Sequence, residues 1–189
     1  MISIFKTIKT KLFKLSMLFI VLLVISCTEN KNTVEEQEVI DIEEFKEPLI
    51  STNKEIVRLE DADIDFMIKR YSWEMEKSPT GLRYIIENKG DSYRPQTKDE
   101  VEISFYTKNM YGDFLYSSEE DGNKVFRVNK TNEIGGLHEA VQMLGEGGKA
   151  KLIIPSYLAY GMVGDGDLIR ERTILIMDIE IIRITKSNN

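Results

Sequence analysis

Side chains that could perform acid–base or nucleophilic chemistry are scarce in this sequence. His138 is the only histidine and Cys27 is the only cysteine. A serine or cysteine nucleophile activated by a histidine is therefore disfavoured. The sequence also lacks a GxGxxG between a strand and a helix, and it lacks GxxxxGK[ST], the motif of P-loop nucleotide sites. These absences argue against most hydrolytic and redox enzymes.

The stretch with the most distinctive spacing is GGKAKLIIPSYLAYG, residues 147–161. Its alternating part ends at Pro155, which cannot donate a hydrogen bond to a sheet, so a strand should leave the sheet there. Tyr160 follows, and the glycines after it allow a loop to turn. The GDGD stretch at residues 164–167 has two carboxylates but lacks the further ligands of a calcium loop. We interpret it as a solvated turn and expect no metal.

The N-terminus predicts export. MISIFKTIKTKLFK carries four lysines and no acid, and the apolar run LSMLFIVLLVI follows it and ends at Ser26–Cys27. This layout is typical of a secretory signal peptide, here residues 1–26. VISC resembles a lipobox, so we expect Cys27 to carry lipid and the protein to be an envelope lipoprotein, facing the periplasm or in the outer membrane. The alternative is an N-terminal anchor helix with an incidental cysteine.

Loss of residues 1–26 would remove four of the 25 basic residues and none of the 32 acidic ones, taking the net charge from −7 to −11. Such a charge argues against nucleic acid as a partner. The expected partner is the membrane, to which several acyl chains together would anchor the protein stably.

Residues 27–54 are acidic with weak periodicity, and we expect a lipidated acidic tether. Residues 55–78 have apolar side chains near helical spacing, which predicts an N-terminal helix. Ser78-Pro79-Thr80-Gly81 should end it. The sequence leaves open whether this helix packs on the domain or forms a homodimer.

After Gly81 the pattern changes from helical to alternating. Strands are expected at LRYIIENKG, EVEISFYTKN, GDFLYSS, KVFRVN, KAKLIIPS and ERTILIMDIEIIRIT. GGLHEAVQMLGEG predicts one short amphipathic helix ending at Gly145, with Leu137, Val141 and Leu144 on a shared face. Mostly antiparallel strands around a single helix make an α+β domain over residues 79–189.

From about Thr80 to Thr185 the chain resembles an FKBP-type peptidyl-prolyl isomerase domain. The matching pieces occur in the family's order: TGLRYII, KDEVEISFYT, GDFLYSS, VFRVNKTNEIGGLHEAVQMLGEGGKAKLIIPSYLAYG and TILIMDIEII. The resemblance implies a half-open antiparallel sheet wrapped over one short helix. It also implies an apolar pocket between helix and sheet that holds a prolyl ring and isomerises the bond before it without a cofactor.

The resemblance further implies the site residues. Tyr160 matches a rim tyrosine that would hydrogen-bond a peptide carbonyl. Phe105 and Leu137 stand at the two other positions expected to be catalytic, where the family usually has tyrosine and tryptophan. The expected substrate-binding residues are Leu115, Tyr116, Phe126, Ile134, Ile169 and Met177. Among these, Phe126 would be a pocket-wall aromatic.

Several positions depart from the family pattern. Leu115-Tyr116 stands where Phe-Asp is typical, Met177 stands where phenylalanine is usual, and the flap reads LIRERTIL in place of a proline-rich segment. Apolar residues such as Phe105, Leu137 and Met177 could also simply be core.

Three functions therefore remain open. The first is an isomerase assisting the folding of proline-containing exported polypeptides. The second is a catalytically weak chaperone or assembly module for the envelope or gliding machinery, and the third is a purely structural lipoprotein. Lipobox, tether, helix and altered FKBP domain together resemble the gliding motility-associated lipoproteins of Bacteroidetes.

Overall fold

The computed structural model describes residues 42–187, with side chains from Ser51 onward. The predicted signal peptide (1–26), the lipidation site Cys27 and the first part of the tether lie outside the described residues. In chain order the elements are α2 (Ile42–Tyr71), β1 (Glu76–Lys77), β2 (Arg83–Asn88), β3 (Glu100–Asn109), β4 (Phe114–Ser117), α3 (Ser118–Asp121), β5 (Lys124–Arg127), α4 (Gly135–Val141), β6 (Lys149–Ile154), the 3₁₀ helix η1 (Ser156–Leu158) and β7 (Leu175–Thr185).

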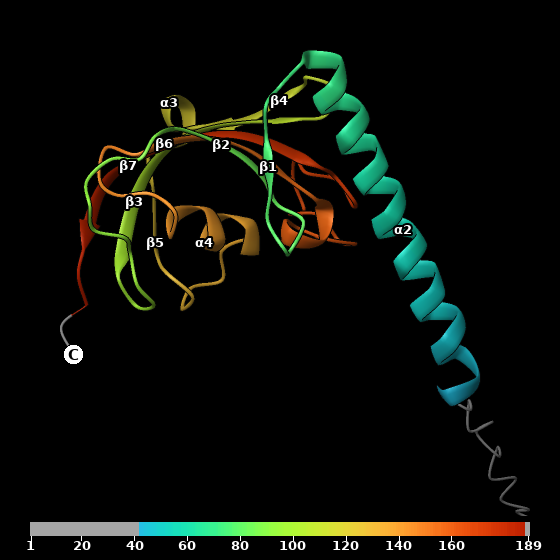
Figure 1. Ribbon diagram of the computed structural model, residues 1–189. Helices are drawn as coiled ribbons and strands as arrows, with labels where there is room; N and C mark the ends of the chain where they lie inside the picture. Colours follow the sequence, from blue (N-terminus) through green and yellow to red (C-terminus); the bar gives the residue numbers. More distant parts are fainter. Residues whose placement is uncertain (1–41, 188–189) are drawn as a thin grey trace, which may run out of the picture. The chain divides into compact units, whose positions relative to one another are not determined.

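The strands form one antiparallel sheet in the order β1-β2-β6-β7-β3-β4, with β5 paired to β3. The two longest strands, β3 and β7, pair along their whole length from Glu100↔Thr185 to Asn109↔Leu175. Figure 1 shows the sheet curved over α4, which lies on its concave side. The half-open sheet over one short helix that the sequence predicted is confirmed.

The concave face of the sheet carries the main core because apolar residues alternate along its central strands. On β3 the inward residues are Val101, Ile103 and Phe105, as the alternation predicted. On β7 the inward residues are Leu175, Met177, Ile179 and Ile181, while Ile174 and Ile176 belong to a second cluster. β7 is therefore apolar on both faces near its start, which is typical of a strand covered on two sides.

Helix α4 packs closely on β6. Its residue Gly136 lies so near Ile154 that an added Cβ would come within 2.5 Å of the Ile154 Cγ2. Leu137, Val141 and Leu144 are all fully buried, as their shared face predicted. The helix ends at Val141, short of the predicted stop at Gly145.

The predicted bounds of the N-terminal helix, residues 55–78, were wrong at both ends. The helix begins at Ile42, inside the expected tether, and ends at Tyr71. Glutamate and lysine before residue 55 favour helix even without a clear apolar period. At the other end, Ser72 has φ 54°, which terminates the helix, and Glu76–Lys77 then pairs with β2.

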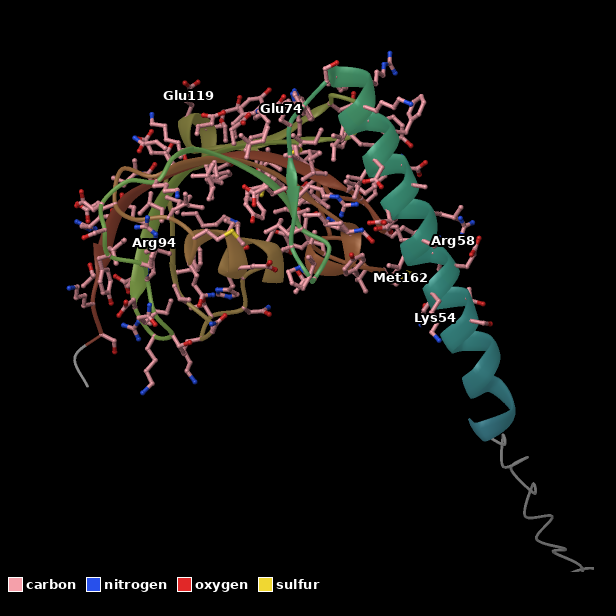
Figure 2. All side chains as sticks on the ribbon, viewed as in Figure 1. Lys54, Arg58, Glu74, Arg94, Glu119 and Met162 are labelled. Carbon is pink, nitrogen blue, oxygen red and sulfur yellow. The ribbon has the colours of Figure 1, made fainter. Side chains whose placement is uncertain are left out.

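One face of α2 covers the convex side of the sheet. Ile64 and Met67 are buried against Ile153, Ile174 and Ile176. Charged side chains such as Arg58 on α2 and Glu119 on α3 project outward (Figure 2). No helix within residues 42–187 is long and apolar enough to span a bilayer.

Candidate functional site

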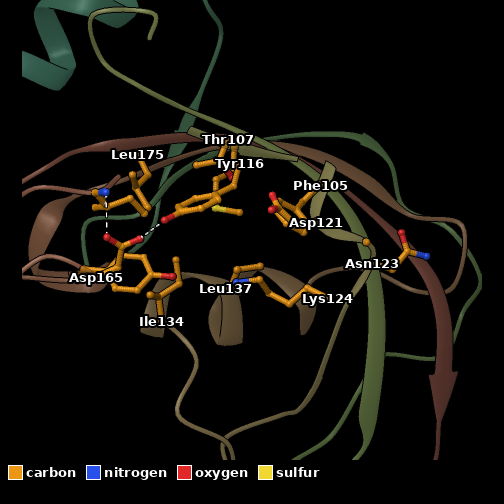
Figure 3. Close-up of a pocket in the computed structure, with 14 residues that line it drawn as sticks. Phe105, Thr107, Tyr116, Asp121, Asn123, Lys124, Ile134, Leu137, Asp165 and Leu175 are labelled. Carbon is orange, nitrogen blue, oxygen red and sulfur yellow. Dashed lines mark hydrogen bonds between the residues drawn. The ribbon is translucent and has the colours of Figure 1, made fainter. Parts of the chain in front are cut away.

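A pocket of about 290 Å³ opens between α4 and the concave face of the sheet. Side chains from β3, β4, β7, α4 and the segments around β5 and after β6 meet there (Figure 3). Its lining residues are Phe105, Thr107, Tyr116, Asp121, Gly122, Asn123, Lys124, Ile134, Leu137, Tyr160, Asp165, Ile169, Leu175 and Met177. Seven of the nine residues expected from the sequence therefore come together in one cavity.

The floor and inner walls of the pocket are apolar. Leu137, from the first turns of α4, is fully buried, and Phe105 and Met177 project from neighbouring strands. Ile134 and Ile169 are also buried, although both come from loops. Because these side chains stay in place through packing with the main core, the pocket can hold an apolar ring in water-poor surroundings.

Tyr160 lies at the end of the segment that follows β6. The strand ends at Ile154, Pro155 breaks the ladder, and η1 turns the chain toward the pocket. The ring of Tyr160 is half-buried, and its hydroxyl has no hydrogen-bond partner within the described part of the chain. Burial, helped by the negative charges of Glu133 and Asp165, raises the pKa of Tyr160 to about 12. The phenol is therefore a neutral donor over the physiological pH range.

Tyr116 and Asp165 form a polar pair on another wall. The Tyr116 hydroxyl donates to Asp165 Oδ2 at 2.6 Å (Figure 3). Asp165 Oδ1 accepts the backbone N–H groups of Asp167 and Ile169, both at 2.9 Å. Burial raises the pKa of Tyr116 to about 12, aided by its hydrogen bond to Asp165. Burial alone would raise the pKa of Asp165, but the hydrogen bonds from Tyr116 and the backbone outweigh it and lower the pKa.

The positively charged side chain of Lys124 lines the pocket on the side of β5. Lys124 Nζ lies 5.4 Å from the centre of the Phe105 ring and 3.1 Å from Glu133 Oε2. Its aliphatic stem can contact an apolar ligand while its charge stays paired at the rim. Among the side chains of residues 51–187, no group of three histidine, cysteine or acidic residues could hold a metal ion.

Two expected site residues do not line the pocket. Phe126 pairs with Val101, four residues before Phe105 on β3, and its ring packs edge-on against His138 at 5.3 Å. Lys124, which pairs with Ile103, is the β5 residue that reaches the cavity. The structure therefore does not bring Phe126 to the cavity wall, and Lys124, two residues earlier on the same strand, lines it instead.

Leu115 is the second expected residue that does not line the pocket. Thr107 pairs with Tyr116 while Lys108 pairs with Phe114, so Leu115 is the extra residue of a β-bulge. It is buried in the main core, but it does not line the pocket. The bulge allows Leu115 to pack inward beside Tyr116, and only Tyr116 reaches the cavity.

Comparison with known proteins decides the family. The sequence model of FKBP-type peptidyl-prolyl cis-trans isomerases matches residues 91–182. FK506-binding protein 2 of Dictyostelium discoideum is 36% identical over 103 residues, which cover 50% of this chain and 77% of that protein. The chain belongs to the FKBP-type peptidyl-prolyl cis-trans isomerase family. A crystal structure of the peptidyl-prolyl cis-trans isomerase of Pseudomonas syringae pv. tomato matches with a TM-score of 0.57 and 28% identity. That match covers 66% of this chain and 92% of the other.

Two other relatives are longer than the region that they share with this chain. The probable FKBP-type isomerase FkpA of Neisseria meningitidis serogroup B is 33% identical over 116 residues, covering 61% of this chain and 42% of that protein. Outer membrane protein MIP of Legionella longbeachae is 29% identical over 109 residues, covering 58% of this chain and 46% of that protein. The chain thus spans less than half the length of these two relatives.

Sequence reasoning missed the charged residues of this pocket. Lys124, Asp121 and Asp165 all line it, and Asp165 lies in the stretch we had interpreted only as a solvated turn. A signal for Lys124 was available, since it lies two residues before Phe126 and so on the same strand face. No local signal points to Asp165, because its partner Tyr116 is 49 residues away in sequence.

Proposed function

We propose that this protein is a peptidyl-prolyl cis-trans isomerase that acts on proline-containing exported polypeptides. One observation carries the proposal: an apolar pocket has, at its rim, a tyrosine hydroxyl without a hydrogen-bond partner in the described chain. A hydroxyl in that position can donate to a bound peptide. Seven residues at positions that the family uses line the same cavity.

The reaction is a rotation about the amide bond before proline. It must break amide resonance against a barrier of about 18–20 kcal/mol, which takes tens to hundreds of seconds without a catalyst. The planar amide is more charge-separated than the twisted one, so water-poor surroundings favour the twisted form. No bond is broken and no proton is transferred, which fits a pocket without a nucleophile or base.

Four of the pocket residues have defined roles in this proposal. The prolyl ring rests on Leu137 between the side chains of Phe105 and Met177. Tyr160 donates its O–H to a carbonyl of the peptide and so holds the chain on one side of the rotating bond. Because the pKa of Tyr160 is about 12, this donor keeps its proton throughout the physiological range.

We further propose that the protein is an envelope lipoprotein anchored through Cys27, similar to the gliding motility-associated group. The supporting observations are the signal and lipobox pattern and the relationship to an outer membrane protein. A homodimer through residues 55–78 is also proposed, since Leu59 and Phe66 are exposed on one face of α2. Labelling with a fatty-acid analogue, lost in Cys27→Ala, tests the anchor, and sedimentation of the full chain tests the dimer.

The isomerase proposal is tested by a protease-coupled assay on the full chain with a prolyl peptide. We expect a rate enhancement proportional to protein concentration. Tyr160→Phe should lower kcat/KM about fivefold, the effect of one neutral hydrogen bond of about 1 kcal/mol. Tyr106→Phe, which removes an exposed hydroxyl outside the pocket, is the matched control. Absence of any enhancement by the wild-type chain would refute the proposal.

A second candidate is a catalytically weak chaperone or assembly module with the same fold. Lys124 at the pocket wall favours it, since a charged ammonium group beside the cavity makes the surroundings of a bound prolyl ring less apolar. Suppression of client aggregation that persists in Tyr160→Phe and Leu137→Ala, together with negligible isomerase activity, would select this function.

A further inference from the structure

A buried acid on α2 contacts the segment that positions Tyr160. Glu60 is only 6% exposed, and its carboxylate accepts two hydrogen bonds from Ser156, which is 96 residues away in sequence. The Ser156 N–H lies 3.0 Å from Glu60 Oε2, and the Ser156 hydroxyl lies 2.6 Å from Glu60 Oε1. Ser156 is itself buried, so no water can readily replace this partner.

The backbone carbonyl of Ser156 forms hydrogen bonds with the neighbours of Tyr160. The Ser156 carbonyl accepts the N–H of Ala159 at 3.0 Å and the N–H of Gly161 at 2.8 Å. These two residues flank Tyr160 directly. Ser156 therefore links the backbone around Tyr160 to α2, because it is hydrogen-bonded to Glu60 on one side and to Ala159 and Gly161 on the other.

A second contact holds the same face of α2 to the domain. Arg83, 2% exposed, donates to Asp61 at 2.6 Å and Asp65 at 2.8 Å, and also to the carbonyl of Gly81 at 2.6 Å. The adjoining Thr80 carbonyl accepts the hydroxyl of Tyr157, a residue of η1.

The Thr80 contact reaches the other side of the pocket as well. The Thr80 hydroxyl donates to Glu139 on α4 at 2.6 Å. Glu139 is two residues after Leu137, the pocket floor. The acids of α2 thus support both the segment that carries the rim and the helix that carries the floor.

We propose that Glu60 is a positioning residue for Tyr160, so that α2 is part of the working isomerase unit and not only a spacer before it. This inference rests on the function proposed above. Without the Glu60 carboxylate, the Ser156 N–H and hydroxyl lose their buried acceptor and the turn before Tyr160 can shift. A shift of the turn moves the phenol relative to the pocket while leaving the sheet and its core intact.

The test uses the full chain with Glu60→Ala, Glu60→Gln and the control Glu55→Ala. Glu55 lies on the same helix, but its exposed carboxylate pairs only with Arg58 of that helix. We expect Glu60→Ala to lower kcat/KM about fivefold, an effect equal to one misplaced hydrogen bond in the transition state. Glu60→Gln keeps an acceptor for the Ser156 N–H and should recover most of the activity. Glu55→Ala should match wild type.

A double variant separates positioning from general stability. If Glu60 acts through the Tyr160 hydroxyl, Glu60→Ala should change kcat/KM little once Tyr160→Phe is present. Equal losses in both backgrounds would overturn the proposal. If Glu60→Ala does not fold, Ser156→Ala replaces it, since this substitution removes one of the two hydrogen bonds to Glu60. We expect the same pattern in both backgrounds, with a smaller loss of kcat/KM.

A readout independent of activity uses ¹⁹F NMR of fluorotyrosine-labelled protein, with the Tyr160 resonance assigned by its loss in Tyr160→Phe. We expect Glu60→Ala to shift or broaden this resonance and Glu55→Ala to leave it unchanged. An unchanged resonance in Glu60→Ala overturns the inference, even if the wild type is an active isomerase. A displaced resonance in a protein without isomerase activity supports the positioning contact and refutes the proposed function instead.

Discussion

Replacement of Tyr116 by phenylalanine tests the polar wall of the pocket. The substitution removes the hydroxyl that donates to Asp165 at 2.6 Å and accepts the N–H of Leu168 at 3.3 Å, while the ring can remain in place. A hydrogen bond to a charged group contributes about 1.5–3 kcal/mol when buried. Tyr116 and Asp165 are both partly exposed, so solvent screening reduces the expected loss to about 1 kcal/mol.

This loss should raise the pKa of Asp165 and lower stability only while that group is ionised. About 1 kcal/mol corresponds to a decrease in Tm of roughly 2–4 °C for a chain of this size. Asp165 has a lowered pKa in the folded state, so its contribution is present above the unfolded value of about 3.9 and disappears as pH falls through the folded value. The variant and wild type should therefore differ at pH 7 and converge near pH 2.

Two measurements check this prediction on the full chain. Thermal melts followed by circular dichroism give the Tm difference at both pH values, and a ¹³C NMR titration gives the pKa of the Asp165 carboxyl group. Tyr106→Phe is the matched control, since it removes an exposed hydroxyl from the neighbouring strand. An Asp165 pKa that stays the same, or a Tm loss equal at both pH values, would refute the reasoning.

Three further predictions follow from the pocket and its surroundings. Because the pKa of Tyr160 is raised from about 10 to about 12, its contribution to stability is complete below pH 10 and is lost as pH rises through 12; Tyr160→Phe should flatten the alkaline unfolding curve in that window. Leu137→Ala should destabilise the fold by about 3 kcal/mol in urea unfolding, whereas the control Leu168→Ala, on the exposed flap, should cost less than about 0.5 kcal/mol. Lys124→Phe should tighten binding of apolar prolyl peptides severalfold by calorimetry, and unchanged or weaker binding would show that the lysine stem already serves as the wall.

Sequence alone predicts the parts of this fold that depend on local periodicity. The alternation of Leu175, Met177, Ile179 and Ile181 on β7 identifies the core face because an apolar side chain recurs at every second position. The fully buried position of Leu137 likewise follows from the helical period of its segment. The apolar half of the site was predictable because the same side chains that make it also make the core.

The polar half depends on pairing register, which one sequence does not determine. Whether Lys124 or Phe126 reaches the pocket is decided by which of Ile103 and Val101 each one opposes on β3. Tyr116 and Asp165 meet only because the loop between η1 and β7, which carries Asp165, lies beside β4. The contact from Glu60 to Ser156 joins residues 96 apart, and nothing near either residue in the sequence signals it.

The central claim is that the pocket between α4 and the sheet speeds rotation about the bond before proline. NMR exchange spectroscopy measures this directly, by following the cis and trans signals of a short prolyl peptide with a small amount of the full chain. We expect exchange cross-peaks that report an interconversion rate rising in proportion to protein concentration, and this rate should fall in Tyr160→Phe but not in Tyr106→Phe. Interconversion that stays on the uncatalysed scale of tens of seconds at every protein concentration would contradict it.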